Sequence, residues 1–242
     1  MRRSKGAMIG SLVMDLLLMA VCYGYVVLTI LISDRLSDHA GVSRKSSRKF
    51  LHAMIGNLPL VIPFFSWRFA PFLVAAPFIL VTYVASPVSP FQGLRGRLRG
   101  LSELTEEGHH IGLVFYSISY TVLALLFPDR PYVIAAGILP MAYGDSTAAL
   151  IGVRYGRLRY RIIGWKSVEG SAAMFAATFI ALMLSLAYFT LLYPLDLRRL
   201  VMPVLAVASV AAVVECFTPK GLDNVTVPAF SALTFLLTFG GA

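Results

Sequence analysis

A carboxylate, Asp145, lies inside the apolar segment 131–152. A charged side chain near the centre of a bilayer costs about 2.5–3.5 kcal/mol unless it meets water, a cation or a partner group. Small side chains surround it, and these allow another helix or a ligand to approach the backbone: Gly144, Ser146, Ala148, Ala149 and Gly152. We interpret Asp145 as a ligand of magnesium or of the substrate. The alternative is a helix-packing face that tolerates one carboxylate.

A basic connection follows this segment and leads into the next predicted helix. It contains Arg154, Arg157, Arg159 and Arg161, and it is followed by Lys166, Ser167, Glu169 and Gly170. Lys166 and Glu169 are three residues apart at the predicted helix start, so they share one face. The free N–H groups and the dipole of a helix N-terminus favour phosphate. The alternative is that the arginines orient the chain in the membrane, with Ser167 as N-cap and Glu169 as a first-turn acid.

Three more places combine groups that suit a phosphorylated ligand. Arg48 and His52 are four residues apart, which places them on one helical face. Glu215 ends an apolar segment, and Asp223-Asn224 opens the last one. The structural alternatives are a packing role for His52, a helix cap at the start of the last segment, and a Glu215 side chain that reaches the membrane surface.

Membrane-spanning helices must position these residues. The chain has 242 residues, of which 58% are hydrophobic and 14% charged, and its mean hydropathy is +0.78. Soluble domains carry about 25% charged residues, and one span needs roughly 20 apolar residues. We therefore expect an all-α fold: a single integral membrane domain, residues 1–242, built as a polytopic bundle of about eight (seven to nine) helices. The expected spans are 7–32, 49–66, 68–86, 109–127, 131–152, 168–193, 200–217 and 225–241.

The charge distribution indicates which end of the bundle faces the cytoplasm. The net charge is +9, and the basic residues cluster in connections, which favours anionic headgroups and phosphorylated ligands over nucleic acid. Connections after the odd-numbered spans carry 14 Lys and Arg, and the opposite side carries 7, including a basic N-terminus. The positive-inside rule places the more basic side in the cytoplasm. We expect a multi-pass protein of the cell membrane in a prokaryote, or of the endoplasmic reticulum in a eukaryote.

Cysteine and histidine usage argues against two other kinds of site. Cys22 and Cys216 are the only cysteines and lie in apolar segments, which predicts neither a disulfide framework nor a zinc site. His109 and His110 are adjacent, so on a helix they face different directions and do not form a metal pair.

The expected topology brings the chemically capable residues to one membrane face. Asp145 and Glu215 lie near the ends of their spans, and Glu169 and Asp223 lie near the starts of theirs. Carboxylates are hard oxygen ligands for Mg²⁺, and Lys, Arg and His neutralise phosphate. We expect a magnesium–nucleotide site at the cytoplasmic face.

These pieces, in this order, resemble the CTP-dependent polyprenol kinase family, which includes dolichol kinase and phytol and farnesol kinases. The matching pieces span residues 44 to 230: Arg48 to His52, Gly144-Asp145 with Gly152 and Gly156, Lys166 to Ser171, Glu215, and Asp223-Asn224 with Pro228. Glu106 or Glu107 with Gly108 resembles a looser family element.

The resemblance implies transfer of the terminal phosphate of CTP, with Mg²⁺, to the hydroxyl of a membrane-dissolved isoprenoid alcohol of the polyprenol, dolichol, phytol or geranylgeraniol type. It gives catalytic roles to His52, Asp145, Lys166, Glu169 and Asp223. The residues expected to bind nucleotide and phosphate are Arg48, Lys49, Gly144, Gly152, Arg154, Gly156, Lys166, Ser167, Gly170 and Asn224. Those expected to hold the metal are Asp145, Glu215 and Asp223.

Two other classes stay open at this point, as does the oligomeric state. CDP-lipid synthases also use CTP and magnesium in a helical bundle, and they resemble the Gly-Asp and Lys elements, but their repeated glycines and aspartates are absent near Asp223. A transporter or scaffold would spread its buried charges over the membrane depth, whereas here they gather at one side.

Overall fold

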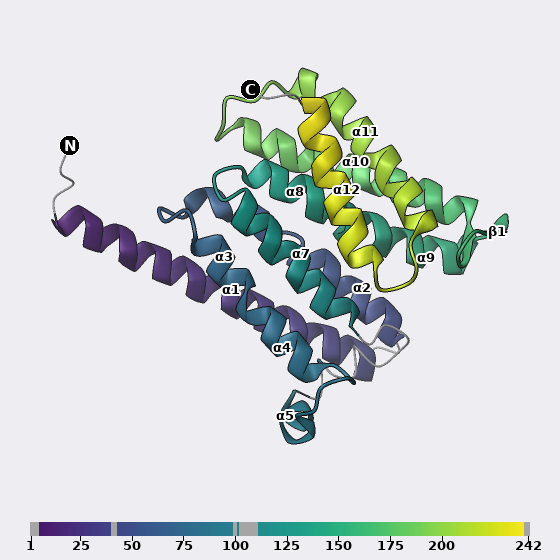
Figure 1. The fold of residues 1–242 in the computed structure, drawn as a ribbon, viewed down its shortest axis with the longest axis horizontal. Helices are drawn as coiled ribbons and strands as arrows, with labels where there is room; N and C mark the ends of the chain where they lie inside the picture. Colours follow the sequence, from purple (N-terminus) through teal and green to yellow (C-terminus); the bar gives the residue numbers. More distant parts are fainter. Residues whose placement is uncertain (1–4, 40–42, 99–100, 102–110, 240–242) are drawn as a thin grey trace.

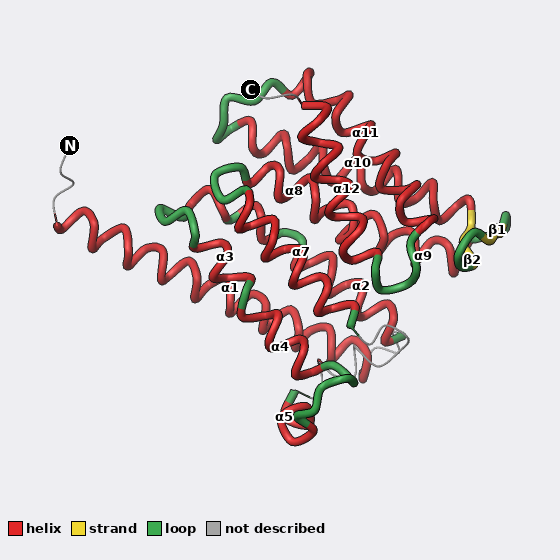
Figure 2. Tube along the Cα trace, in the orientation of Figure 1, coloured by secondary structure: helices red, strands yellow, loops and turns green. Residues whose placement is uncertain are grey.

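The chain folds as a bundle of helices with one short β-hairpin at its edge (Figures 1 and 2). The computed structural model describes residues 5–39, 43–98, 101 and 111–239. Its first half contains α1 (Lys5–His39), α2 (Arg44–Ile55), the 3-10 turns η1 (Leu58–Leu60) and η2 (Ile62–Phe64), α3 (Ala70–Ala75), α4 (Pro77–Ala85), α5 (Gln92–Arg97) and α7 (Gly112–Leu126). Its second half contains α8 (Pro131–Leu139), the π-helical turn η3 (Pro140–Asp145), α9 (Ser146–Tyr155), β1 (Arg159–Arg161), β2 (Trp165–Ser167), α10 (Val168–Thr190), α11 (Leu197–Phe217) and α12 (Asp223–Phe239).

Within the described residues, four helical segments are long and apolar enough to cross a bilayer: Gly10–Leu36, Pro131–Tyr155, Val168–Thr190 and Leu197–Phe217. Two shorter apolar segments, Ala70–Ala85 and Gly112–Leu126, accompany them. Large apolar side chains such as Leu16, Val21 and Leu184 are more than half exposed on these helices. Water solvates such surface poorly and lipid solvates it well. The predicted all-α, polytopic membrane fold is confirmed.

The second and third expected spans are divided in the structure. Over 49–66, α2 ends at Ile55, and two 3-10 turns follow that start with Leu58-Pro59 and Ile62-Pro63. Over 68–86, α3 and α4 are separate helices that meet at Ala76, directly before Pro77. Proline has no backbone N–H and interrupts the α-helical series of hydrogen bonds. The expected spans were derived from hydropathy, which does not detect where proline interrupts a helix.

The other expected boundaries differ at their ends. α1 continues to His39, beyond the expected limit of 32. His109, His110 and residues 240–241 lie outside the described residues, as do Glu106, Glu107 and Gly108. The connection 153–167 is ordered: α9 continues to Tyr155, and β1 then pairs with β2 in antiparallel register, with Tyr160 opposite Lys166.

A π-helical turn places Asp145 in the middle of the bundle. α8, η3 and α9 form one continuous helical segment, and 72% of its most apolar window is buried. Pro140 supplies no N–H at the point where α8 gives way to the wider turn. Within the turn, Gly144 lies against Met174 and Thr178 of α10, and a side chain there would collide with both. The small residues around Asp145 therefore allow close helix packing.

α2 lies against this central segment and completes one end of the bundle. Gly56, which follows α2, packs on Ala142, and the Ser146 hydroxyl donates to the Lys49 carbonyl at 3.1 Å. α12 packs on α7, α8 and α11. As a result, the η3–α9 junction, the hairpin, the start of α10, the end of α11 and the start of α12 meet beside α2 (Figure 1).

Candidate active site

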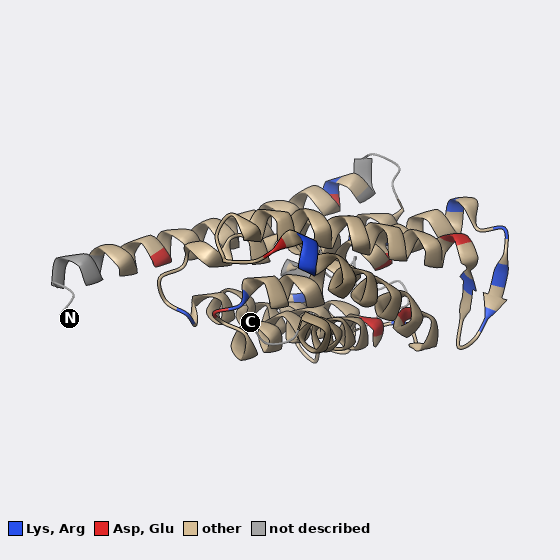
Figure 3. Cartoon of the chain, turned by 90° about the horizontal axis from the view of Figure 1, so that it is seen from above, with Lys and Arg blue, Asp and Glu red and all other residues tan. Residues whose placement is uncertain are grey.

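A cavity of about 290 Å³ lies where these elements meet. Nine charged residues from the described part of the chain line it: Lys45, Arg48, Lys49, Asp145, Arg159, Lys166, Glu215, Lys220 and Asp223. Six of them are cations and three are carboxylates, so the wall has an excess of positive charge. The hairpin beside the cavity also carries Lys and Arg (Figure 3). A concave wall of this kind suits a ligand with several negative charges.

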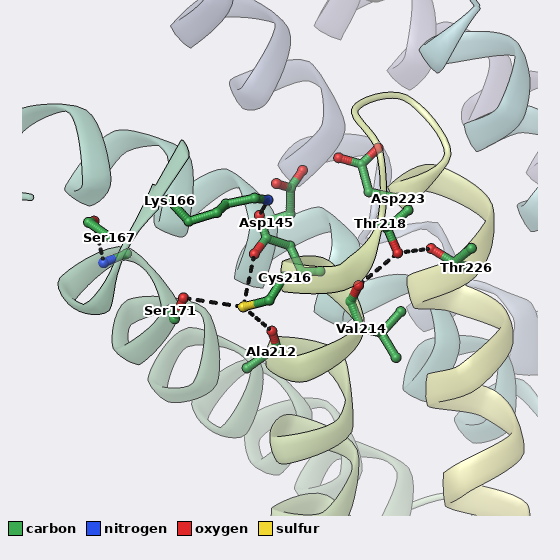
Figure 4. Close-up of polar contacts among 12 residues, drawn as sticks. Asp145, Lys166, Ser167, Ser171, Ala212, Val214, Cys216, Thr218, Asp223 and Thr226 are labelled. Carbon is green, nitrogen blue, oxygen red and sulfur yellow. Dashed lines mark hydrogen bonds and ion pairs between the residues drawn. The ribbon is translucent and has the colours of Figure 1, made fainter. Parts of the chain in front are cut away.

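Two lysine–carboxylate pairs lie in the cavity. Lys49 of α2 pairs with Asp145 of η3, and Lys166 of β2 pairs with Glu215 of α11. Figure 4 shows Asp145, Lys166 and Asp223 in the same region of the structure. The four side chains are mostly buried, and breaking a buried pair by removing one partner costs about 3–5 kcal/mol. The lysines therefore explain how apolar helices tolerate Asp145 and Glu215.

Asp223, the third carboxylate, has no cation partner within the described part of the chain. It lies in the first turn of α12, where its Oδ1 accepts hydrogen bonds from the backbone N–H groups of Gly221 and Asn224, both at 3.0 Å. Burial, together with the nearby Asp145 carboxylate, raises the pKa of Asp223 to about 6. A bound cation would supply the positive charge that this carboxylate lacks.

The donor set fits a magnesium ion shared with a phosphate better than a metal site made by protein alone. No group of three or more His, Cys, Asp or Glu among the described residues is close enough to hold a metal. Magnesium, however, is commonly held by one or two carboxylates together with substrate phosphates. Asp145 and Asp223 supply the carboxylates, and the buried Oδ1 of Asn224 has no hydrogen-bond partner in the described ranges.

The N-terminus of α10 forms one side of the cavity through Lys166, Ser167 and Gly170. The Ser167 hydroxyl caps this helix by accepting a hydrogen bond from the Gly170 N–H at 3.1 Å. At Gly156, a side chain would meet the Gly152 carbonyl and Ser167. Gly156 thus lets the end of α9 approach the capped start of α10.

The hairpin is attached to the bundle at two points. The Glu169 carboxylate accepts hydrogen bonds from the N–H groups of Arg157 at 3.0 Å and Leu158 at 3.1 Å. The Tyr160 hydroxyl contacts Ser171 Oγ at 2.6 Å and Cys216 Sγ at 2.8 Å, and Ser171 also lies 3.7 Å from this sulfur (Figure 4). Burial and the bond to Cys216 raise the pKa of Tyr160 to about 12. Glu169 therefore holds the hairpin and does not line the cavity.

α2 supplies three cations and one histidine. Lys45, Arg48 and Lys49 line the cavity. Burial, followed by the charges of Lys49, Lys220 and Arg48, lowers the pKa of Lys45, which shows how closely the cations are crowded. His52 lies just behind them, with its ring stacked on Tyr116 at 4.7 Å between centroids.

The structure brings most of the expected site residues to one cavity. Those that line it are Arg48, Lys49, Asp145, Gly152, Lys166, Ser167, Gly170, Glu215 and Asp223. Those outside its wall are His52, Gly144, Arg154, Gly156, Glu169 and Asn224. Lys45, Arg159 and Lys220 also line the cavity but were not among the expected site residues. In the sequence, Lys45 and Lys220 count only as charges of the connections, and a role in membrane orientation stays open for Arg159. The spacing of Lys45 and Arg48, three residues apart on one helix, was the available signal.

The chain is similar in sequence to several known proteins. It is 35% identical over 229 residues to a phytol kinase of Synechocystis sp., covering 89% of this chain and 88% of that one. It is 31% identical to a probable chloroplastic phytol kinase of Triticum aestivum (86% and 72% covered) and 27% identical to a dolichol kinase of Saccharomyces cerevisiae (84% and 39% covered). No family model and no solved structure matches the chain. The first two similarities extend over most of both chains, and the chain therefore belongs to the polyprenol kinase family, the isoprenoid-alcohol kinases.

Proposed function

We propose that this protein transfers the terminal phosphate of CTP, bound with Mg²⁺, to the hydroxyl of an isoprenoid alcohol dissolved in the membrane. The curated relatives are named for phytol and dolichol, which are long hydrocarbon chains that end in a hydroxyl group. The observation that carries the proposal is the charged cavity, where six cations and three carboxylates from distant parts of the sequence meet at the ends of apolar helices.

The cations suit the phosphates of the donor. Arg48 and Lys49 of α2 and Lys166 of β2 line one cavity, and the N-terminal end of α10, where the helix dipole favours anions, forms part of the same wall. In phosphoryl transfer the protein contributes mainly positioning and charge neutralisation, with little covalent chemistry. CTP is assigned as the donor from the family resemblance, while the wall itself supports a nucleoside triphosphate.

Asp145 and Asp223 would hold magnesium, which would supply positive charge to neutralise the charge that develops on the phosphate during transfer. Phosphate that binds Lys49 and Lys166 would draw these ammonium groups from Asp145 and Glu215. The carboxylate of Asp145 then becomes available to the cation. The two buried pairs thus support exchange of partners when nucleotide and metal bind together.

The acceptor alcohol can keep its chain within the bilayer, because the cavity lies among helices that the bilayer surrounds. Arg48, Lys45 and the basic hairpin belong to the more positively charged side of the chain. The positive-inside rule therefore supports a cavity that faces the cytoplasm, where CTP is available.

An activity matrix of nucleotides against alcohols tests the proposal. Purified protein in lipid nanodiscs is mixed with CTP, ATP, GTP or UTP, with Mg²⁺ or EDTA, and with phytol, geranylgeraniol or a longer polyprenol. We expect lipid monophosphate and CDP in the presence of CTP and Mg²⁺, and none with EDTA. Release of pyrophosphate with a CDP-linked lipid would instead identify a CDP-lipid synthase, and absence of any lipid product would contradict the proposal.

A further inference from the structure

A second cavity also has α2 in its wall and lies among α1, α2, α4 and α7. Its volume is about 40 Å³, and its wall is apolar, with Val26, Leu51, Phe78 and Leu113 each contributed by a different one of these helices. None of the described residues that line it is charged. It therefore suits a hydrocarbon group.

The polar groups of this wall are mostly satisfied by the protein. Thr82 Oγ1 donates to the Phe78 carbonyl at 2.6 Å, and Ser117 Oγ donates to the Leu113 carbonyl at 3.0 Å. Such bonds leave a hydrocarbon occupant with no polar group to desolvate. The buried Tyr120 hydroxyl is different, since it has no hydrogen-bond partner in the described ranges. The π electrons of an isoprene double bond are a weak acceptor for such a donor.

α2 forms a wall of both cavities. Arg48 and Lys49 line the charged cavity, whereas Leu51 and Ile55 line the apolar one. With 3.6 residues per turn, these two sets form neighbouring stripes along one helix. His52 lies next to both stripes.

The rings of His52 and Tyr116 stack at the wall of the apolar cavity. Tyr116 lines the apolar cavity, its ring lies 4.7 Å from that of His52, and its hydroxyl donates to the His52 carbonyl at 3.1 Å. His52 follows Arg48 and Lys49 by one turn and is 3% exposed. A ligand that occupied both cavities would pass this pair of rings.

We propose that the apolar cavity binds the part of the isoprenoid chain nearest the hydroxyl, so that the hydroxyl reaches the charged cavity beside His52. A volume of this size holds about three water-sized groups, so it takes a short stretch of the chain while the remainder lies in the bilayer. The assignment rests on the proposed function, because that function makes an isoprenoid alcohol the acceptor.

Photocrosslinking maps the occupant directly. A geranylgeraniol analogue with a diazirine near its hydroxyl end is added to the full-length protein in nanodiscs without nucleotide, irradiated, and located by peptide mass spectrometry. We expect adducts on α2, α4 and α7 at or beside Leu51, Phe78 and Leu113, and we expect excess geranylgeraniol to suppress them. Adducts confined to lipid-facing positions such as Leu126 and Leu184 would overturn the assignment.

A matched pair of variants on α7 adds a kinetic measurement. Ser117→Leu enlarges a side chain in the cavity wall, and Val122→Leu enlarges, by less, a side chain of the same helix at a position that is 45% exposed and outside the cavity. We expect Ser117→Leu to reduce the cavity adducts and raise the KM for the alcohol about tenfold, with the KM for CTP unchanged. Val122→Leu should leave the cavity adducts and the KM for the alcohol unchanged. Wild-type adducts in Ser117→Leu would contradict the assignment, and the wild-type map decides the question if this variant does not fold.

The two measurements separate this assignment from the proposed function. Crosslinking needs no turnover, so cavity adducts without any lipid phosphate would support the binding site and contradict the kinase activity. If lipid phosphate forms and the KM for the alcohol is the same in Ser117→Leu and wild type, the kinase activity is supported and the binding site is contradicted.

Discussion

The two cavities that share α2 as a wall are built by different means. The charged one depends on pairs between distant residues: Lys49 and Asp145 are 96 positions apart, and Lys166 and Glu215 are 49 apart. The apolar one depends on the shapes of side chains from α1, α2, α4 and α7. From this difference we expect substitutions that change side-chain charge to impair ligand binding in the charged cavity. Substitutions that change side-chain volume should instead affect binding in the apolar cavity.

The largest effect is expected for Asp145→Asn. Loss of this carboxylate removes a proposed metal ligand and leaves Lys49 without its counter-charge, so kcat should fall about a thousandfold. Initial rates with saturating CTP, Mg²⁺ and alcohol measure it. Near-normal turnover would remove Asp145 from the metal site.

The double variant Lys49→Gln/Asp145→Asn is the control for stability. It removes both charges together, so thermal unfolding should recover part of the stability that Asp145→Asn loses, since no buried charge is left unpaired. Activity should stay low in both variants. Recovery of activity together with stability would mean that Asp145 only supports the fold.

A smaller effect is expected for Lys166→Ala. Because Lys166 is proposed to bind phosphate, its loss should raise the KM for CTP by about ten- to a hundredfold, the scale of one charge-assisted contact. The KM for the alcohol should stay constant. The matched control is Arg154→Ala, which removes a cation of the same connection that does not line the cavity. An equal rise of the KM for CTP in Lys166→Ala and Arg154→Ala would mean that any nearby positive charge has this effect, and would contradict a direct contact of Lys166 with phosphate.

Asp223→Asn tests the unpaired carboxylate through stability. Burial raises the pKa of Asp223, so ionisation opposes folding, and this loss of stability is complete once the pH exceeds about 6. Without metal, the variant should be more stable than wild type by about 2–3 kcal/mol at pH 7.5. The gain should shrink as the pH falls from 6 towards 4, when the wild-type group is protonated.

Chemical or thermal unfolding at several pH values, with and without Mg²⁺ and CTP, measures this difference. Added Mg²⁺ and CTP should stabilise wild type more than Asp223→Asn. A variant that is less stable than wild type at pH 7.5, or that gains as much from the ligands, would contradict the role given to Asp223.

The smallest effect is expected for Glu169→Gln. Its carboxylate binds the backbone of the hairpin at Arg157 and Leu158, outside the cavity wall. The amide oxygen can still accept one of these bonds, so kcat/KM should change by only about two- to fivefold, the scale of one exposed hydrogen bond. A loss as large as that of Asp145→Asn would place Glu169 in the reaction itself.

Much of the membrane fold could be predicted from the sequence, because apolar length and helix period are local properties. The prolines Pro59, Pro63 and Pro77 are plain in the sequence, but the expected spans did not end at them, because average hydropathy stays high across these positions. The hairpin at 159–167 was missed because three-residue strands among arginines carry too little pattern.

The sequence allowed the types of residue in the site to be predicted, but not which side chains pair with one another. Buried carboxylates in apolar segments were visible, as was the anion-binding character of the α10 start. Nothing local indicates that Lys49 pairs with Asp145, because that contact depends on how α2 packs against η3. The apolar cavity carries no sequence signal at all, since its residues resemble any other core.

The transfer of the terminal phosphate of CTP to the alcohol is tested most directly by following labelled CTP. Protein in nanodiscs receives geranylgeraniol or phytol with CTP labelled at either the γ- or the α-phosphate. We predict that the γ-label enters the lipid and the α-label leaves as CDP. Entry of the α-label into the lipid, or of neither label, would contradict the account.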